Sequence, residues 1–185
     1  MKSSTTRSRV VPDIAGTPSR LLRHAVEDLG ADHRNFLDLA CGFGRNALYL
    51  ASRGASGIAV DVDEARTFAA YARLVVEGLD GRVVVRTEAE LDFLSACRSS
   101  FDLVVCTDYW RPRLLLDLSR VVSPGGWLVL HTPTARGTNW RGLPERNDAM
   151  RDVVACGLEI VECRLAQPKG SPTRVALNLV GRLRR

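Results

Sequence analysis

The sequence predicts an α/β fold in which a doubly wound, mainly parallel sheet is covered by helices on both faces. Short apolar segments alternate with amphipathic segments of helical spacing between residues 35 and 130, which is the pattern of repeated β-α-β units. Such units make right-handed crossovers, so their strands are parallel. Two long apolar segments near the end of the chain are joined by a Pro/Gly-rich loop. This pattern predicts a hairpin, and therefore an antiparallel strand at the end of the sheet.

Local signals place the individual elements. Residues 1–16 have no sustained period, and we expect a flexible N-terminal arm followed by a single domain over 17–185. Thr17 followed by Pro18 is typical of a helix start, and an apolar stripe continues that helix toward Gly30. Apolar stripes predict further helices at 46–53, 64–77, 114–122 and 147–156. Strands are expected at 36–39, 57–60, 83–85, 101–106, 127–130, 158–165 and 175–183, the fifth of them after a turn at 123–126.

Composition excludes several classes of protein. With 185 residues, 45% hydrophobic and 25% charged, the chain matches soluble globular domains, which excludes disorder, collagen repeats and coiled coil. The net charge of +5 comes from arginines, some of them near the ends of the chain, so nucleic acid is not the expected partner. The sequence leaves the oligomeric state open.

Cysteine usage and hydropathy indicate where the protein works. The five cysteines are odd in number and lack both a Cys-x-x-Cys pair and zinc-finger spacing, so we expect free thiols, a reducing compartment and no metal site. No apolar run approaches the roughly 18 residues of a membrane helix, and no signal peptide begins the chain. These features predict a cytoplasmic protein that does not enter a membrane.

Small residues between the first strand and the next helix predict a ligand site. Ala40, Gly42 and Gly44 alternate along this loop, where a missing side chain lets a ligand touch the backbone and unpaired helix N–H groups face it. Asp61 follows Gly42 by 19 residues, at the end of the second strand. A carboxylate at that place can accept both hydroxyls of a ribose.

Asp38 separates two interpretations of this loop. The spacing of Gly42, Gly44, Ala47 and Asp61 is also compatible with an NAD-type loop, which holds a pyrophosphate. A carboxylate at Asp38 would repel a pyrophosphate, whereas it suits the ammonium and sulfonium of S-adenosylmethionine. The sequence therefore favours S-adenosylmethionine as the cofactor.

Residues 37–51, Leu-Asp-Leu-Ala-Cys-Gly-Phe-Gly-Arg-Asn-Ala-Leu-Tyr-Leu-Ala, resemble motif I of the class I S-adenosylmethionine-dependent methyltransferases. They are especially similar to the tellurite-resistance (TehB-like) branch. Residues 101–105 and 120–130 resemble the fourth strand of the family and the lead into its fifth. The resemblance implies a Rossmann-like, seven-stranded sheet whose terminal strand is antiparallel. Ala40 departs from the commonest form of the motif, which has glycine there.

The resemblance also implies roles for single residues. Asp38 would lie near the methionine ammonium, and Asp61 would bind the ribose hydroxyls. Glu88 would bind the adenine amino group, with Glu90 or Asp92 as alternatives. The other implied cofactor contacts are Ala40, Gly42 and Gly44 at the methionine moiety, Cys106 and Thr107 at the sulfonium, and Val62 and Ala89 on the cofactor side.

The acceptor is less closely defined. Methyl transfer depends largely on proximity and orientation, and a base is needed only for a protonated nucleophile. Asp108, Tyr109 and His131 follow the fourth and fifth strands and are the candidate catalytic residues. The candidate acceptor residues are Trp110, Arg136, Trp140 and Arg141. Their arginines would suit an anionic acceptor, although this loop could also be a solvated surface.

The predicted function is transfer of the sulfonium methyl group to a small-molecule acceptor, because the chain is little larger than a methyltransferase core. Two alternatives stay open. One is an NAD-type Rossmann oxidoreductase. The other is a catalytically silent, cofactor-binding accessory protein.

Overall fold

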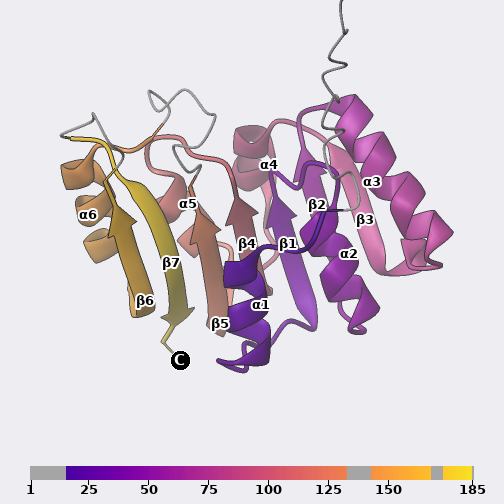
Figure 1. The fold of residues 1–185 in the computed structure, drawn as a ribbon, viewed down its shortest axis with the longest axis horizontal. Coiled ribbons are helices and arrows are strands. Elements are labelled where there is room, and N and C mark those ends of the chain that lie inside the picture. Colours follow the sequence, from indigo (N-terminus) through magenta and orange to yellow (C-terminus); the bar gives the residue numbers. More distant parts are fainter. Residues whose placement is uncertain (1–15, 133–142, 168–172, 185) are drawn as a thin grey trace, which may run out of the picture.

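One seven-stranded sheet, with strand order β3-β2-β1-β4-β5-β7-β6, forms the centre of the protein. The computed structural model describes residues 16–132, 143–167 and 173–184 (Figure 1). The strands are β1 (Asn35–Leu39), β2 (Ser56–Asp61), β3 (Val83–Thr87), β4 (Phe101–Thr107), β5 (Val122–His131), β6 (Leu158–Ala166) and β7 (Ala176–Leu183). The strands from β3 to β5 pair in parallel, and β7 is antiparallel to both β5 and β6. The predicted α/β class, the parallel sheet and the terminal hairpin are confirmed.

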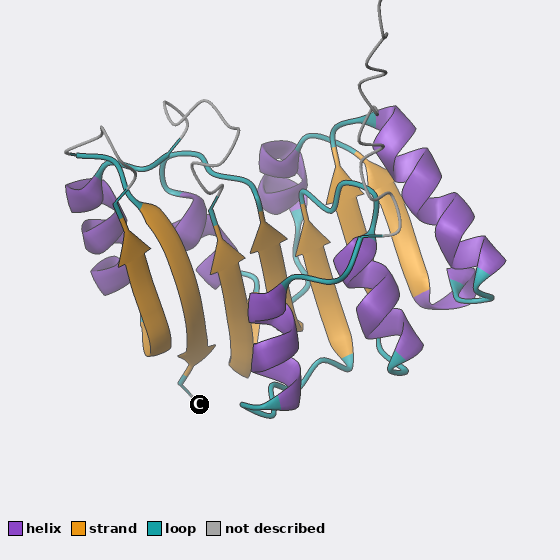
Figure 2. Ribbon diagram, viewed as in Figure 1, coloured by secondary structure: helices purple, strands orange, loops and turns teal. Residues whose placement is uncertain are grey.

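Helices cover both faces of the sheet (Figure 2). They are α1 (Arg20–Glu27), α2 (Arg45–Ser52), α3 (Glu64–Val76), α4 (Glu90–Ala96), α5 (Leu114–Ser119) and α6 (Arg146–Ala155), with a short 3₁₀ helix η1 (Asp80–Arg82). Two apolar cores separate these layers. Leu22, Leu50 and Leu74 from α1 to α3 belong to one core, whereas α4 to α6 contribute to the other. The sheet is therefore buried on both faces, which explains why its central strands are continuous apolar runs.

Three local predictions were wrong. The first helix begins at Arg20 and not near Thr17, and its N-cap is Ser19. Helix α4 was not anticipated, because its seven residues are too few to show a helical period. The fifth strand begins at Val122 rather than at Trp127. Val122 pairs with Phe101 of β4, and the register between β4 and β5 then shifts, so the segment 123–126 lies within the strand as an irregularity.

Several further findings concern the described residues alone. All five cysteines are free thiols. In the ranges 16–132, 143–167 and 173–184, no helix is long and apolar enough to cross a membrane. The same part of the chain has no cluster of His, Cys, Asp and Glu suited to a metal ion. The arm predicted at 1–16 lies outside the described residues except for Gly16.

Candidate functional site

The loop between β1 and α2 turns sharply over the carboxyl end of the sheet. Ala40, Gly42 and Gly44 all have φ between 55° and 74°, the left-handed region that costs an L-residue roughly 1–2 kcal/mol. Glycine adopts this conformation without that cost, so the sequence keeps glycine at two of the three positions. A Cβ atom at Gly42 would meet nothing within 4 Å. Gly42 therefore leaves open space where a ligand can approach the backbone.

Asp61, at the end of β2, holds this loop in place. One of its carboxylate oxygens accepts a hydrogen bond from the Gly42 N–H at 2.8 Å, and the other accepts one from the Asp63 N–H at 3.0 Å. The Asp61 side chain is buried. Each carboxylate oxygen can accept more than one hydrogen bond, so Asp61 can still bind hydroxyl groups of a ligand while it fixes the loop.

A cavity of about 410 Å³ lies against the loop, and we call it the loop cavity. Its walls come from the glycine loop, the ends of β2 and β4, and the starts of α3 and α4. The lining residues used below are Ala40, Gly42, Asp61, Val62, Glu90, Thr107 and Tyr109. The sequence analysis named all of these positions except Glu90 as site residues, and it gave Glu90 as an alternative to Glu88.

The structure places four other predicted cofactor residues away from the walls of this cavity. Gly44 faces helix α3, where an added Cβ atom would lie 2.8 Å from the Cβ of Ala70. Cys106 is fully buried in the apolar core behind the sheet, because alternate residues of a strand point to opposite faces. Glu88 forms an ion pair with Arg86, and neither Glu88 nor Ala89 is among the residues that line the cavity.

Asp38 lies beneath the loop rather than on the cavity wall. It is completely buried, and one carboxylate oxygen accepts a hydrogen bond from the Ala47 N–H at 3.1 Å. Its other oxygen, Oδ1, has no hydrogen-bond partner among the described residues. Burial raises the pKa of Asp38 to about 7, although a hydrogen bond from Asn46 opposes the shift. An unpaired buried carboxylate oxygen is stabilised by a nearby positive charge.

Asn46 is a site residue that the sequence analysis missed. Its buried amide donates to Thr107 Oγ1 at 3.0 Å and accepts from the backbone N–H of Ser19 at 3.0 Å. It thereby joins three segments distant in sequence. The available signal was a polar residue on the buried side of an otherwise apolar helix, since such a residue needs partners.

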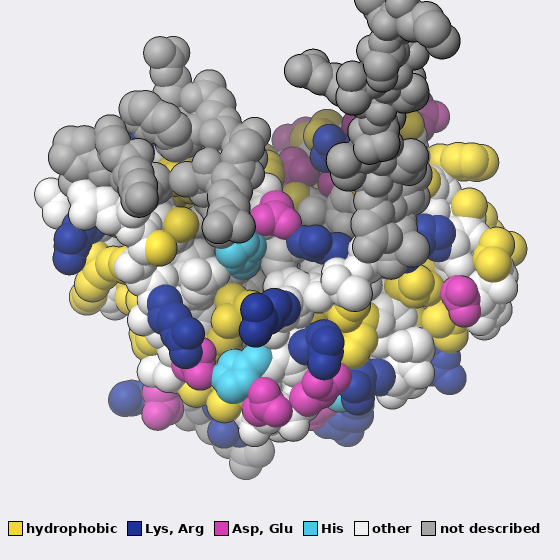
Figure 3. All heavy atoms as spheres, in the orientation of Figure 1, with side chains coloured by type: hydrophobic (Ala, Val, Ile, Leu, Met, Phe, Trp, Pro, Cys, Tyr) yellow, Lys and Arg dark blue, Asp and Glu magenta, His cyan; other side chains and the backbone are white. Residues whose placement is uncertain are grey.

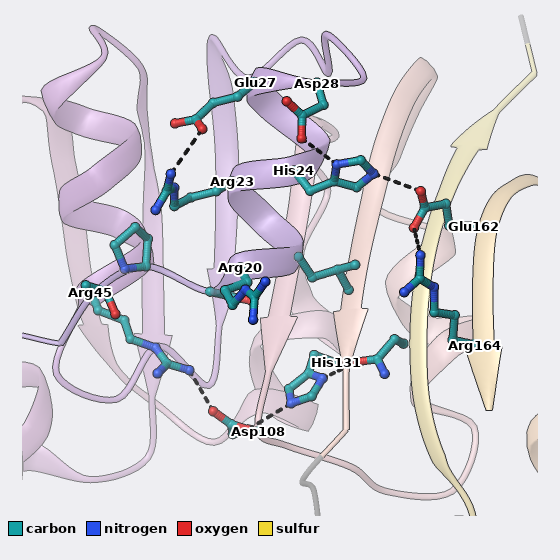
Figure 4. Close-up of a pocket in the computed structure, with 15 residues that line it drawn as sticks. Arg20, Arg23, His24, Glu27, Asp28, Arg45, Asp108, His131, Glu162 and Arg164 are labelled. Carbon is teal, nitrogen blue, oxygen red and sulfur yellow. Dashed lines mark hydrogen bonds and ion pairs between the residues drawn. The ribbon is translucent and has the colours of Figure 1, made fainter. Parts of the chain in front are cut away.

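A second cavity, of about 960 Å³, lies beside helix α1 (Figure 4). We call it the α1 cavity. It is bounded by α1, the end of β5, and strands β6 and β7, and it shares Arg45 and Asp108 with the loop cavity. Basic, acidic and histidine side chains gather on this face of the molecule (Figure 3). The ion pair between Arg45 and Asp108, at 2.6 Å, therefore lies on the wall common to both cavities.

His131 links that ion pair to β7. Its Nε2 lies 3.4 Å from Asp108 Oδ1, and its Nδ1 is hydrogen-bonded to Asn178 Oδ1. Because an amide oxygen only accepts, Nδ1 carries a proton and Nε2 of the neutral ring has a free lone pair. Asp108 raises the pKa of His131, and His131 lowers the pKa of Asp108. The arrangement can therefore accept a proton at Nε2 and stabilise the imidazolium that results.

The remaining predicted residues have different environments. Tyr109 lines the loop cavity, and burial raises the pKa of its hydroxyl. Trp110 packs against the apolar core behind the sheet, and it lines neither the loop cavity nor the α1 cavity. Arg136, Trp140 and Arg141 lie outside the described residues.

The strand order with antiparallel β7, together with a glycine loop tied to an acid at the end of β2, defines the Rossmann-like fold of the class I methyltransferases. Residues 36–126 match the family model described as "Methyltransferase domain". This part of the chain therefore resembles a methyltransferase domain, and the fold is the one that class I methyltransferases share. This result disfavours the NAD-type alternative.

Known proteins agree with this assignment of the fold. The chain is 32% identical over 110 residues to "Probable methyltransferase PMT4" of Arabidopsis thaliana, over 56% of this chain and 17% of that protein. It thus spans less than a fifth of that relative. A putative sarcosine dimethylglycine methyltransferase from Galdieria sulphuraria has a TM-score of 0.69 at 15% identity, with 88% of this chain and 84% of that one covered.

Magnesium protoporphyrin IX methyltransferase from Synechocystis PCC 6803, solved with bound S-adenosylmethionine, has a TM-score of 0.65 at 16% identity. The superposition covers 88% of this chain and 76% of that one. Such low identity shows a shared fold and no more than that.

Proposed function

We propose that this chain transfers a methyl group from S-adenosylmethionine, bound in the loop cavity, to a small-molecule acceptor. The observation that supports this most directly is the hydrogen bond between Asp61 and the Gly42 N–H, which closes the loop and leaves open space above Gly42. The residues present fit the cofactor chemically. Its ribose needs hydrogen-bond acceptors, which Asp61 offers, and its positive charges suit the unpaired oxygen of Asp38.

We assign cofactor contacts from the residues that line the loop cavity. Ala40 and Gly42 would contact the methionine moiety through their backbone, Asp61 would accept the ribose hydroxyls, and Val62 would pack on the adenosine. Thr107, held by Asn46, would lie toward the sulfonium. Glu90 replaces Glu88 as the acid for the adenine amino group, because Glu90 lines the cavity and Glu88 is paired with Arg86.

The cofactor supplies an electrophilic methyl group when it is bound. The chain's own contribution is to position the acceptor and to receive a proton if the acceptor has one to lose. His131 fits the second task because Asn178 keeps a proton on Nδ1, so the lone pair of the neutral ring is on Nε2, which lies 3.4 Å from Asp108 Oδ1. Asp108 then stabilises the protonated ring. The catalytically silent alternative has no use for such a base beside the cofactor cavity, which favours an enzyme.

Two finer assignments belong to the same proposal. The similarity of residues 37–51 to the TehB-like branch supports an oxyanion as acceptor. Five free thiols support a cytoplasmic location.

Calorimetry with S-adenosylhomocysteine and with NAD tests the proposal. We expect S-adenosylhomocysteine to bind and NAD not to bind. The variant Asp61→Asn should lose about tenfold or more in affinity for S-adenosylhomocysteine, because an amide cannot accept from the Gly42 and Asp63 N–H groups and the ribose together. Glu64→Gln is the matched control, since Glu64 is an exposed acid three residues later.

Unfolding in urea shows whether each variant is folded. Binding of NAD but not of S-adenosylhomocysteine, or unchanged affinity in a folded Asp61→Asn variant, contradicts the proposed function.

A further inference from the structure

The α1 cavity holds one arginine that is paired with no acid of the described residues. Three of its four arginines are paired: Arg23 with Glu27 at 3.4 Å, Arg45 with Asp108 at 2.6 Å, and Arg164 with Glu162 at 4.0 Å. The side chain of Arg20 has no ion pair or hydrogen bond with any residue in the described part of the chain. In Figure 4, Arg20 lies between the group around Asp108 and the group around Glu162, and no dashed line reaches it.

The acids of this cavity are all occupied by other partners. His24 is held between Asp28 at 2.6 Å and Glu162 at 2.8 Å. Glu27 accepts from Arg53 at 2.6 Å and from Tyr49 at 3.0 Å, in addition to its pair with Arg23. Asp108 is shared by Arg45 and His131. Among the charged side chains that line the cavity, Arg20 is therefore the one without an ion-pair or hydrogen-bond partner in the described part of the chain, so its donors are available to an anionic ligand.

We propose that the α1 cavity is the acceptor site and that it takes a small molecule with an oxyanion group, which Arg20 binds. This inference rests on the proposed function. The acceptor's nucleophilic atom would lie toward His131, at the side of this cavity where Arg45 and Asp108 also line the loop cavity. Arginine presents a planar set of donors that matches carboxylate or phosphate oxygens in pairs.

The position of Arg20 depends on the cofactor side of the molecule. Ser19, the residue before Arg20, donates its backbone N–H to Asn46, and Asn46 also binds Thr107 in the loop cavity. One buried amide thus fixes the start of α1 relative to the glycine loop. The same residue, Asn46, therefore fixes the position of Arg20 relative to the loop cavity.

The cofactor and the residues of this site account for every bond and proton in the transfer step. The acceptor's heteroatom forms a bond to the methyl carbon as the carbon–sulfur bond breaks, with the electron pair of that bond left on sulfur. For a hydroxyl or amine acceptor, the proton passes to Nε2 of His131, whose positive charge is then stabilised by Asp108. No further reactant is required.

Solution NMR of the full chain saturated with S-adenosylhomocysteine tests the acceptor site. The probes are 4-hydroxybenzoate, its uncharged amide and phenyl phosphate, and the readout is the imidazole signals of His131. We expect one or both oxyanions to shift these signals, and the amide to bind at least about tenfold more weakly. The relative affinities of the two oxyanions distinguish a carboxylate site from a phosphate site.

Arg20→Gln should weaken oxyanion binding by about tenfold or more and leave the affinity for S-adenosylhomocysteine unchanged. Arg34→Gln is the control, because Arg34 is an exposed arginine that comes directly before β1 and does not line the α1 cavity. Equal binding of the amide, no response to either oxyanion, or unchanged oxyanion binding in Arg20→Gln overturns this inference while the proposed function stands. Failure of the wild-type chain to bind S-adenosylhomocysteine overturns both.

Discussion

The amide oxygen of Asn46 accepts a hydrogen bond from the backbone N–H of Ser19, 27 residues earlier in the chain, at 3.0 Å. The nitrogen of the same amide donates to Thr107 Oγ1 at the end of β4. Asn46 also opposes the rise in the pKa of Asp38 beneath the glycine loop. One buried side chain therefore ties together the start of α1, the glycine loop and the strand end that meet at the two cavities.

Replacing Asn46 by alanine should lower the free energy of unfolding by about 1–3 kcal/mol, because the partly buried N–H of Ser19 and the buried hydroxyl of Thr107 lose their partner. Urea unfolding measures this loss. Asn35→Ala is the control, since the Asn35 side chain is exposed and donates to the Ser100 carbonyl. A loss for Asn46→Ala no larger than that of the control would show that the Asn46 hydrogen bonds do not hold these segments together.

Substitution of Gly44 should mainly affect stability, whereas substitution of Gly42 should mainly affect cofactor binding. Gly44→Val should destabilise the protein, by about 1–3 kcal/mol for overpacking against Ala70 in addition to backbone strain. A valine side chain at Gly42 would extend into the open space that we assign to the cofactor. For the same loss of stability, Gly42→Val should therefore reduce the affinity for S-adenosylhomocysteine more than Gly44→Val does. Urea unfolding and calorimetry on both variants measure the two quantities. Equal stability of the Gly44 variant and wild type would contradict the close approach to α3.

Stability should decrease as pH rises toward neutrality because of Asp38. Burial raises its pKa in the folded protein from 3.8 to about 7, so the folded state binds a proton that the unfolded state has released. The stabilisation is complete below about pH 4, is lost as pH rises to about 7, and changes no further above that. Asp38→Asn should remove this component. Thermal unfolding of both proteins from pH 4 to 8, without ligand, measures it, and parallel curves would contradict the assignment.

Binding of a ligand with an ammonium group should reverse the effect of pH on Asp38. A nearby positive charge favours the ionised carboxylate, so binding of S-adenosylhomocysteine releases a proton and its affinity rises as pH increases through about 7. Calorimetry in buffers of different ionisation enthalpy counts the protons released. An affinity that does not change between pH 6 and pH 8 would place the ammonium away from Asp38.

Asp108→Asn should lower the pKa of His131, because the hydrogen bond and charge of Asp108 are what raise it. If His131 acts as the base, the rise of methyl transfer with pH should then begin at lower pH in the variant. An NMR titration of the His131 imidazole measures the pKa directly and needs no acceptor. Asp92→Asn, an exposed acid on α4, is the control. An unchanged His131 pKa in Asp108→Asn would show that Asp108 does not raise the pKa of His131.

Sequence patterns could predict much of the fold and of the loop cavity, since both depend on local signals. The strands, the glycine loop and Asp61 are each recognisable within a short segment. The α1 cavity could not be predicted in this way. Arg20 and His24 lie on the first helix, far in sequence from Glu162 and Asn178, and a polar residue on an amphipathic helix gives no indication of which strand it will face.

The sequence by itself determined the alternation of strands and helices and the turn at the glycine loop, and it indicated the kind of cofactor, because hydrophobic period, glycine and charge act over a few residues. Only the tertiary structure decided which residues meet. The strand order β3-β2-β1-β4-β5-β7-β6 brings β4, β5 and β7 side by side, so Asp108, His131 and Asn178 become neighbours. Burial then set the pKa of Asp38. Both effects depend on contacts between distant segments, whose energies exist only once the sheet has formed.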